Sequence, residues 1–203
     1  MSTCYIVGAG EFYGRFEKRE GDLVIAADGG YDTLMKIGVT PDLLIGDMDS
    51  INAEGTEVDS LTFPVRKDET DTFLAYREGA RRGYTNFELY GCVGGREDHT
   101  FANYSLLVYA KDAGHSVKMF GNGYYSFAMK NEKVELFGEE LMHLSVFAFG
   151  GEARGVSLRG LEYSGEGITL SPLFPLGVSN RFTREPAEIE VTDGRLLVMA
   201  ECG

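Results

Sequence analysis

Several residue types are scarce in this chain of 203 residues, which has no tryptophan, three histidines and three cysteines. The cysteines, Cys4, Cys92 and Cys202, are an odd number and lie far apart in sequence. This excludes a disulfide framework and the C-x-x-C spacing of zinc and redox motifs, so we expect all three to be reduced and structural. The histidines lack the H-E-x-x-H spacing, and the sequence predicts no histidine-based zinc site.

Long apolar runs and an excess of basic side chains are also missing. No stretch approaches the roughly 18 apolar residues that span a bilayer, and the first residues lack the basic start and apolar segment of a secretory signal. The 19 Lys and Arg against 32 Asp and Glu give a net charge of −13, which disfavours binding to nucleic acid or anionic lipid. We therefore expect a cytoplasmic protein with neither nucleic acid nor membrane as a partner.

The sequence consists of two halves with different patterns. Up to about residue 122, apolar runs typical of buried strands alternate with stretches of helical period that end at a glycine. The expected strands are residues 4–7, 23–27, 43–45, 61–65, 87–90 and 117–120, and the expected helices are residues 31–37, 70–82 and 98–113. This alternation predicts an α/β domain over residues 1–122, with a mostly parallel sheet flanked by helices.

The second half contains only short strand-like runs separated by Gly, Asn, Pro and Asp turn signals. The expected strands are residues 124–129, 134–137, 144–149, 155–158, 168–170, 189–191 and 196–199. Residues 123–203 are therefore predicted to form an all-β sandwich domain.

Pairs of carboxylates follow two of the expected strands in the first half. Asp47 and Asp49 come after residues 43–45, and Asp68 and Asp71 come after residues 61–65. Ligands bind beyond the carboxyl ends of strands in open α/β sheets, and carboxylate oxygens suit Mg²⁺. Each pair alone is also typical of a solvated turn or a helix N-terminus. Two like-charged pairs at one edge repel each other unless a cation compensates, which favours a metal site.

A glycine-rich loop, Gly94-Gly95-Arg96, precedes the third expected helix, for which Asp98 is the expected N-cap. Such a loop can bring backbone amides and a guanidinium group to phosphate, although a surface turn has the same pattern. Asn103, one turn after His99, faces either this site or solvent. Asp28 follows residues 23–27 and can accept hydrogen bonds from a ribose or a basic heterocycle.

Gly8-Ala9-Gly10 after the first expected strand matches part of a dinucleotide-binding fingerprint. Asp28 then lies at about the distance of 20 residues expected for the acid that binds ribose. Tyr13 stands at the position where the fingerprint requires its third glycine. A dinucleotide-binding oxidoreductase is therefore a secondary alternative.

Four segments, in this order and at this approximate spacing, resemble the thiamine pyrophosphokinase family. In the second half, Gly160-Leu161-Glu162-Tyr163 and Val178-Ser179-Asn180 are similar to the family's thiamine-binding motifs, so the resemblance covers nearly the whole chain. The four segments are Asp28-Gly29-Gly30, Pro41-Asp42 with Gly46-Asp47-Met48-Asp49-Ser50, Lys67-Asp68 with Thr70-Asp71, and Gly94-Gly95-Arg96 with Asp98-His99.

The resemblance implies a homodimer with its sites at the subunit interface, which transfers a pyrophosphoryl group from ATP to the hydroxyethyl arm of thiamine. It implies that Asp47, Asp49 and Asp71 hold Mg²⁺ directly or through water. Asp68 or Asp98 would shape the site or receive the alcohol proton. The residues implied in ATP binding are Asp28, Lys67, Gly94, Gly95 and Arg96.

The thiamine-binding half departs from a common family pattern. An aromatic wall attracts a cationic thiazolium ring, but the position after Gly160-Leu161 that often supplies tryptophan holds Glu162, followed by Tyr163. Tyr163 is therefore either this platform or a buried tyrosine of the sandwich. Ser179 and Asn180 either bind the aminopyrimidine or form a plain β-turn. A thiamine or nucleotide sensor without catalytic activity is the main alternative function.

Overall fold

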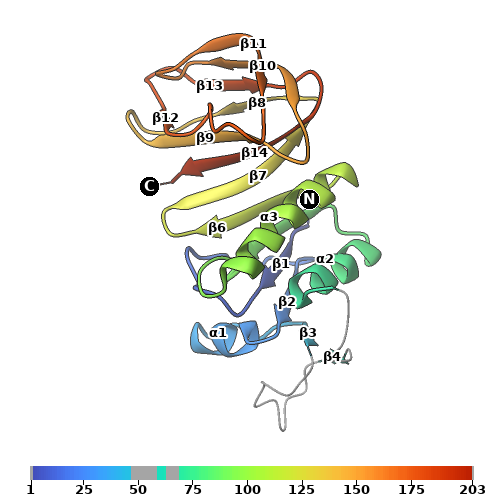
Figure 1. Cartoon of the computed structure of the whole chain (residues 1–203). Coiled ribbons are helices and arrows are strands. Elements are labelled where there is room, and N and C mark those ends of the chain that lie inside the picture. Colours follow the sequence, from blue (N-terminus) through green and yellow to red (C-terminus); the bar gives the residue numbers. More distant parts are fainter. Residues whose placement is uncertain (1, 47–58, 63–68, 203) are drawn as a thin grey trace. The chain divides into compact units, whose positions relative to one another are not determined.

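The computed structural model describes residues 2–46, 59–62 and 69–202 (Figure 1). By its internal contacts the chain divides into two compact units, one containing residues 1–106 and 114–122 and the other containing residues 107–113 and 123–203. Within the described ranges, none of the helices has the length and apolar character that crossing a bilayer requires.

The strands of the first unit pair in parallel, in the order β6-β5-β1-β2-β3-β4. β1, β2 and β3 are buried along their whole length, as strands covered on both faces are. The predicted parallel sheet is confirmed. The strands are β1 (Cys4–Val7), β2 (Leu23–Ala27), β3 (Leu43–Gly46), β4 (Asp59–Thr62), β5 (Asn86–Tyr90) and β6 (Ser116–Gly121).

In the part of the chain that the structure describes, three helices connect strands of this sheet, as expected: α1 (Gly30–Lys36), α2 (Asp71–Arg81) and α3 (Glu97–Asp112). The N-cap of α2 is Thr70, whose hydroxyl oxygen accepts a hydrogen bond from the Phe73 amide at 3.3 Å. The prediction that Asp98 caps α3 is wrong, because the helix begins at Glu97 and Asp98 lies inside its first turn.

The connection from β1 to β2, residues 8–22, contains no helix. Its aromatic side chains pack on the sheet instead. The rings of Tyr5 and Phe16 stack with centroids 4.3 Å apart, and those of Phe12 and Tyr90 stack at 5.4 Å. These rings extend a core that includes Val7, Val24 and Leu44.

The second unit contains two antiparallel sheets, in the orders β12-β9-β14-β7 and β11-β10-β13-β8. One buried cluster takes side chains from both sheets, such as Val146 and Val198 from the first and Val156 and Ile189 from the second. The predicted β-sandwich is confirmed. The strands are β7 (Tyr124–Lys130), β8 (Lys133–Leu136), β9 (His143–Ala148), β10 (Ala153–Arg159), β11 (Gly165–Leu170), β12 (Asn180–Arg181), β13 (Ala187–Glu190) and β14 (Arg195–Glu201).

Candidate active site

The sheet of the first unit has a topological switch point between β1 and β5, where the order of the strands along the chain reverses. From β1 the chain continues to β2, β3 and β4 on one side, whereas β5 lies on the other side and leads to β6. From this point the chain continues to opposite sides of the sheet, and ligands of open α/β sheets bind beyond the carboxyl ends of the strands at such a switch point. The register supports this placement, because Val7 at the end of β1 pairs with both Ala26 and Tyr90.

The predicted site residues of the first unit follow the carboxyl ends of these strands. Asp28 comes directly after β2, and Gly94, Gly95 and Arg96 lie between β5 and α3. Asp71 lies in the first turn of α2. Because α2 leads back to the amino end of β5, its first turn belongs to the same edge of the sheet.

Four predicted site residues, Asp47, Asp49, Lys67 and Asp68, lie outside the described residues. In residues 2–46, 59–62 and 69–202, no three His, Cys, Asp or Glu side chains are placed to hold a metal ion together. Asp71 is the described member of the predicted ligand set. Its hard oxygen donors and its place at the carboxyl edge fit Mg²⁺, whereas the complete set stays a prediction.

Asp28 has a left-handed backbone, with φ of 51°. Its amide donates to the carbonyl of Ile45 at 2.8 Å, which ties the end of β2 to β3. At Gly30, a Cβ atom would lie 1.9 Å from the carbonyl oxygen of Val7. Only glycine therefore lets α1 approach β1 this closely. A strained residue beside such a contact is typical of functional sites.

Asp42, from another segment of the resemblance, lies at the opposite end of the sheet, directly before β3. One of its carboxylate oxygens accepts from the Val24 amide at 2.7 Å, and Lys18 pairs with the other. Asp42 therefore joins the amino ends of β2 and β3 and has a structural role.

The loop after β5 packs against the loop after β1. The Gly8 amide donates to the carbonyl of Tyr90 at 2.8 Å, and the Gly10 amide donates to the carbonyl of Gly91 at 2.7 Å. A dinucleotide-binding fingerprint needs the start of a helix after the first strand, where the pyrophosphate binds. Because residues 8–22 contain no helix and these amides are already bonded, that interpretation is wrong.

Asn103 holds the glycine-rich loop from α3. Its side chain is buried, and its Nδ2 donates to the carbonyl of Cys92 at 2.8 Å. The prediction of a solvent-exposed Asn103 is therefore excluded, and the residue supports the loop. Burial raises the pKa of the neighbouring Cys92 thiol to about 12, which leaves it protonated and unreactive at neutral pH. Cys4 is also buried, whereas Cys202 is exposed, and all three are free.

Arg96 and Asp98 form an exposed ion pair, with Nη2 2.6 Å from Oδ2. The hydrogen bond from Arg96 lowers the pKa of Asp98 to about 2. A carboxylate with this pKa is a poor proton acceptor for an alcohol. A phosphate group that binds Arg96 must compete with Asp98 for the guanidinium.

The second unit contains a pocket of about 270 Å³ at its predicted thiamine-binding motifs. Tyr163 is 65% exposed, so the alternative of a buried tyrosine is excluded. Asn180 is 3% exposed and belongs to β12, not to a plain turn. Ser179 does not line the pocket. The lining residues are Leu158, Tyr163, Ser164, Gly165, Ile168, Leu170, Leu176, Gly177, Val178 and Asn180.

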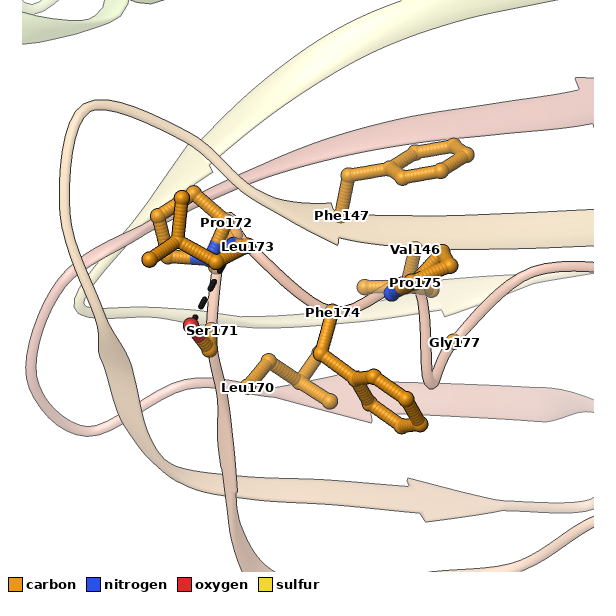
Figure 2. A pocket seen from close by; sticks show the side chains of 10 residues that line it. Val146, Phe147, Leu170, Ser171, Pro172, Leu173, Phe174, Pro175 and Gly177 are labelled. Carbon is orange, nitrogen blue, oxygen red and sulfur yellow. Dashed lines mark hydrogen bonds between the residues drawn. The ribbon is translucent and has the colours of Figure 1, made fainter.

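A smaller pocket of about 110 Å³ shares Leu170 and Gly177 with the first (Figure 2). Residues 171–175 form one wall of this smaller pocket. Figure 2 shows the hydrogen bond at the start of this segment, which the Leu173 amide donates to the Ser171 hydroxyl. This segment carries exposed apolar side chains, including Leu173 and Phe174.

Two family models match the chain. The model for the catalytic domain of thiamin pyrophosphokinase matches residues 17–119. The model for its vitamin B1 binding domain matches residues 131–196. The chain is also 24% identical over 195 residues to the thiamine pyrophosphokinase of Bacillus subtilis (strain 168), covering 89% of this chain and 87% of that protein.

Solved structures share the fold. The crystal structure of thiamine pyrophosphokinase from Bacillus subtilis has a TM-score of 0.88 at 20% identity, covering 98% of this chain and 99% of that one. Thiamin pyrophosphokinase from Candida albicans has a TM-score of 0.78 at 14% identity, covering 100% of this chain and 90% of that one. Because the catalytic-domain model alone matches more than half of the sequence, the chain belongs to the thiamin pyrophosphokinase family.

Proposed function

We propose that this protein transfers the pyrophosphoryl group of ATP to thiamine, giving thiamine diphosphate and AMP. The observation that carries the proposal is the presence, in one chain, of matches to both the catalytic and the vitamin B1 binding domains of the family. The arrangement of polar residues at the carboxyl edge of the first unit's sheet supports it independently.

In this reaction the hydroxyl oxygen of thiamine bonds to the β-phosphorus. The bond from the β-phosphorus to the oxygen that bridges to the α-phosphate breaks, and AMP leaves with that oxygen. The alcohol proton passes to a base. The protein's main tasks are to align these groups and to neutralise charge.

Asp47, Asp49 and Asp71 are the proposed ligands of Mg²⁺. When bound, the metal neutralises charge on the phosphate oxygens. Asp68 and Asp98 are the candidates for the base. The hydrogen bond from Arg96 lowers the pKa of Asp98 to about 2, and a phosphate group that binds Arg96 would release this carboxylate.

The proposed ATP contacts come from five residues with different chemistry. Asp28 offers hydrogen-bond acceptors to the nucleoside, Lys67 and Arg96 offer positive charge to the phosphates, and Gly94 and Gly95 let backbone approach them. Both glycines have positive φ, 77° and 70°, which supports a loop that depends on glycine.

The proposed thiamine contacts lie in the second unit. Tyr163 provides an exposed aromatic face for the cationic heterocycle, worth about 0.5–2 kcal/mol. Ser179 is the proposed polar contact, and Asn180 is proposed to support the site from its buried position. We also propose a homodimer, with sites to which both subunits contribute, and a cytoplasmic location.

The test is to incubate the purified protein with ATP, Mg²⁺ and thiamine and to separate the products. Equal amounts of AMP and thiamine diphosphate are expected. Formation of ADP, or no nucleotide product, would contradict the proposal. The sensor alternative predicts ligand binding without AMP, so the same experiment decides between the two functions.

A further inference from the structure

The turn that follows β10 is joined to β12 through Asn180. The Asn180 Oδ1 atom accepts a hydrogen bond from the Tyr163 amide at 3.0 Å, and its Nδ2 donates to the Tyr163 carbonyl at 2.7 Å. One side chain therefore bonds both backbone groups of one residue. The Glu162 amide also donates to the carbonyl of Arg181 at 3.0 Å. Two successive residues of the turn, Glu162 and Tyr163, are therefore hydrogen-bonded to β12.

The two side chains in this arrangement have opposite exposure. Asn180 is 3% exposed, whereas Tyr163 is 65% exposed and lines the pocket of about 270 Å³. The buried amide thus holds the backbone of a residue whose ring is presented to solvent at the pocket.

The hydrogen-bonding capacity of Asn180 is largely used within the protein. Its Oδ1 also accepts from the Arg181 amide at 2.9 Å, which occupies both lone pairs of that oxygen. Its Nδ2 has two hydrogens, and one of them bonds to Tyr163. A single N–H on a side chain that is 3% exposed is all that remains for a ligand.

We infer that Asn180 is a positioning residue that fixes Tyr163 as the aromatic wall of the thiamine site, and that it is not itself a ligand of thiamine. The inference rests on the proposed function and refines the role of Asn180 within it. A ligand that stacks on Tyr163 would otherwise have to order the backbone of this residue, which costs conformational entropy. Because Asn180 already holds this backbone in one conformation, stacking has a smaller entropic cost.

The first test compares Asn180→Ala with Thr183→Ala. Thr183 donates from its hydroxyl to the Gly160 carbonyl at 2.9 Å, so its removal also weakens this turn but does not affect the Tyr163 backbone. For Asn180→Ala we expect the KM for thiamine to rise about tenfold, while the KM for ATP stays within about twofold. For Thr183→Ala both KM values stay near those of the wild type. An equal rise in the KM for thiamine in both variants would overturn the inference.

A double-mutant cycle with Tyr163→Ala separates positioning from direct binding. If Asn180 acts through Tyr163, Asn180→Ala adds little to the KM for thiamine once the ring has been removed, less than about twofold. If the two effects multiply, Asn180 contacts thiamine itself and the inference is wrong.

A fluorescence measurement tests the same role without turnover. Because the chain contains no tryptophan, Tyr163→Trp introduces one tryptophan at the pocket, whose emission can be excited selectively over that of the tyrosines. We expect its anisotropy to fall when Asn180→Ala is added and to stay unchanged when Thr183→Ala is added. Asn180→Ser replaces Asn180→Ala if the latter does not fold. An unchanged anisotropy overturns the inference. If the protein does not use thiamine, only the kinetic tests fail, so the two proposals can be told apart.

Discussion

Asp71 lies in the first turn of α2 and is a proposed magnesium ligand, and Asp32 lies in the first turn of α1 without such a role. Asp71→Asn should lower kcat by about 10²–10³-fold, because a charge that stabilises the transferred group through the metal is lost. The matched control Asp32→Asn should keep its kcat.

Each of these two substitutions weakens an interaction with a helix dipole, worth about 0.3–1 kcal/mol, so both variants should remain folded. Steady-state kinetics and thermal unfolding check both statements. A normal kcat in Asp71→Asn would remove the residue from the proposed ligand set.

Glu78 on α2 is 9% exposed and forms ion pairs with Arg81 at 2.7 Å and Arg82 at 2.8 Å. The hydrogen bond from Arg81 is the largest cause that lowers the pKa of Glu78 to about 2, from a usual value of 4.5. Because the folded protein binds this proton less readily than the unfolded chain, the stabilisation is present above pH 4.5 and is lost as the pH falls towards 2.

Glu78→Gln should therefore lower the free energy of unfolding by about 1–3 kcal/mol at pH 7. Its difference from the wild type should shrink between pH 5 and pH 2. Urea unfolding across this pH range measures the effect, and a difference that does not change with pH would show that the charge of Glu78 is unimportant.

At the scale of elements, the packing of α2 on the sheet depends on Gly79. A Cβ atom there would lie 2.7 Å from the Phe87 ring and 2.8 Å from the Cys4 sulfur, and both side chains are fully buried or nearly so. Gly79→Ala should destabilise the protein by about 1–3 kcal/mol despite the higher helix propensity of alanine.

Gly151 provides the control for this substitution, because a Cβ atom there has nothing within 4 Å. Gly151→Ala should change the free energy of unfolding by less than about 0.5 kcal/mol. If the two alanine variants are equally stable in denaturant unfolding, α2 can move away from the sheet to accommodate the Cβ atom without a loss of stability.

Much of this arrangement of elements follows from the sequence, because buried parallel strands and helices have distinct periods. The patterns also indicated most of the second unit's strands, although β12, with two residues, is too short to produce a pattern. The dinucleotide interpretation failed because the pairing of Gly10 with Gly91 joins segments far apart in sequence. The sequence pattern does not indicate the role of Asn180 for the same reason, since its partner Tyr163 is 17 residues away.

For the whole molecule, the exposed apolar side chains of residues 171–178 support the proposed dimer. Leu173 is 93% exposed, Phe174 65% and Leu176 58%. Adjacent apolar residues exposed to this degree are typical of surfaces that bind another protein chain. We expect a solution mass of about twice the 22.3 kDa of one chain.

Leu173→Glu should shift this protein towards the monomer, because burying an unpaired carboxylate in an interface is costly. Leu141→Glu is the control, since Leu141 is 64% exposed but lies outside residues 171–178. Light scattering after size-exclusion chromatography measures both. A dimer that persists in Leu173→Glu would show that another surface joins the subunits.

Two prolines, Pro172 and Pro175, flank Leu173 and Phe174 in this segment. Their rings restrict φ, and the Leu176 amide closes a bond to the Phe174 carbonyl at 2.9 Å. The segment has therefore already lost most of its backbone freedom during folding. Covering it with another surface incurs little additional cost for ordering the backbone, so this cost subtracts little from the association free energy of apolar contacts made here.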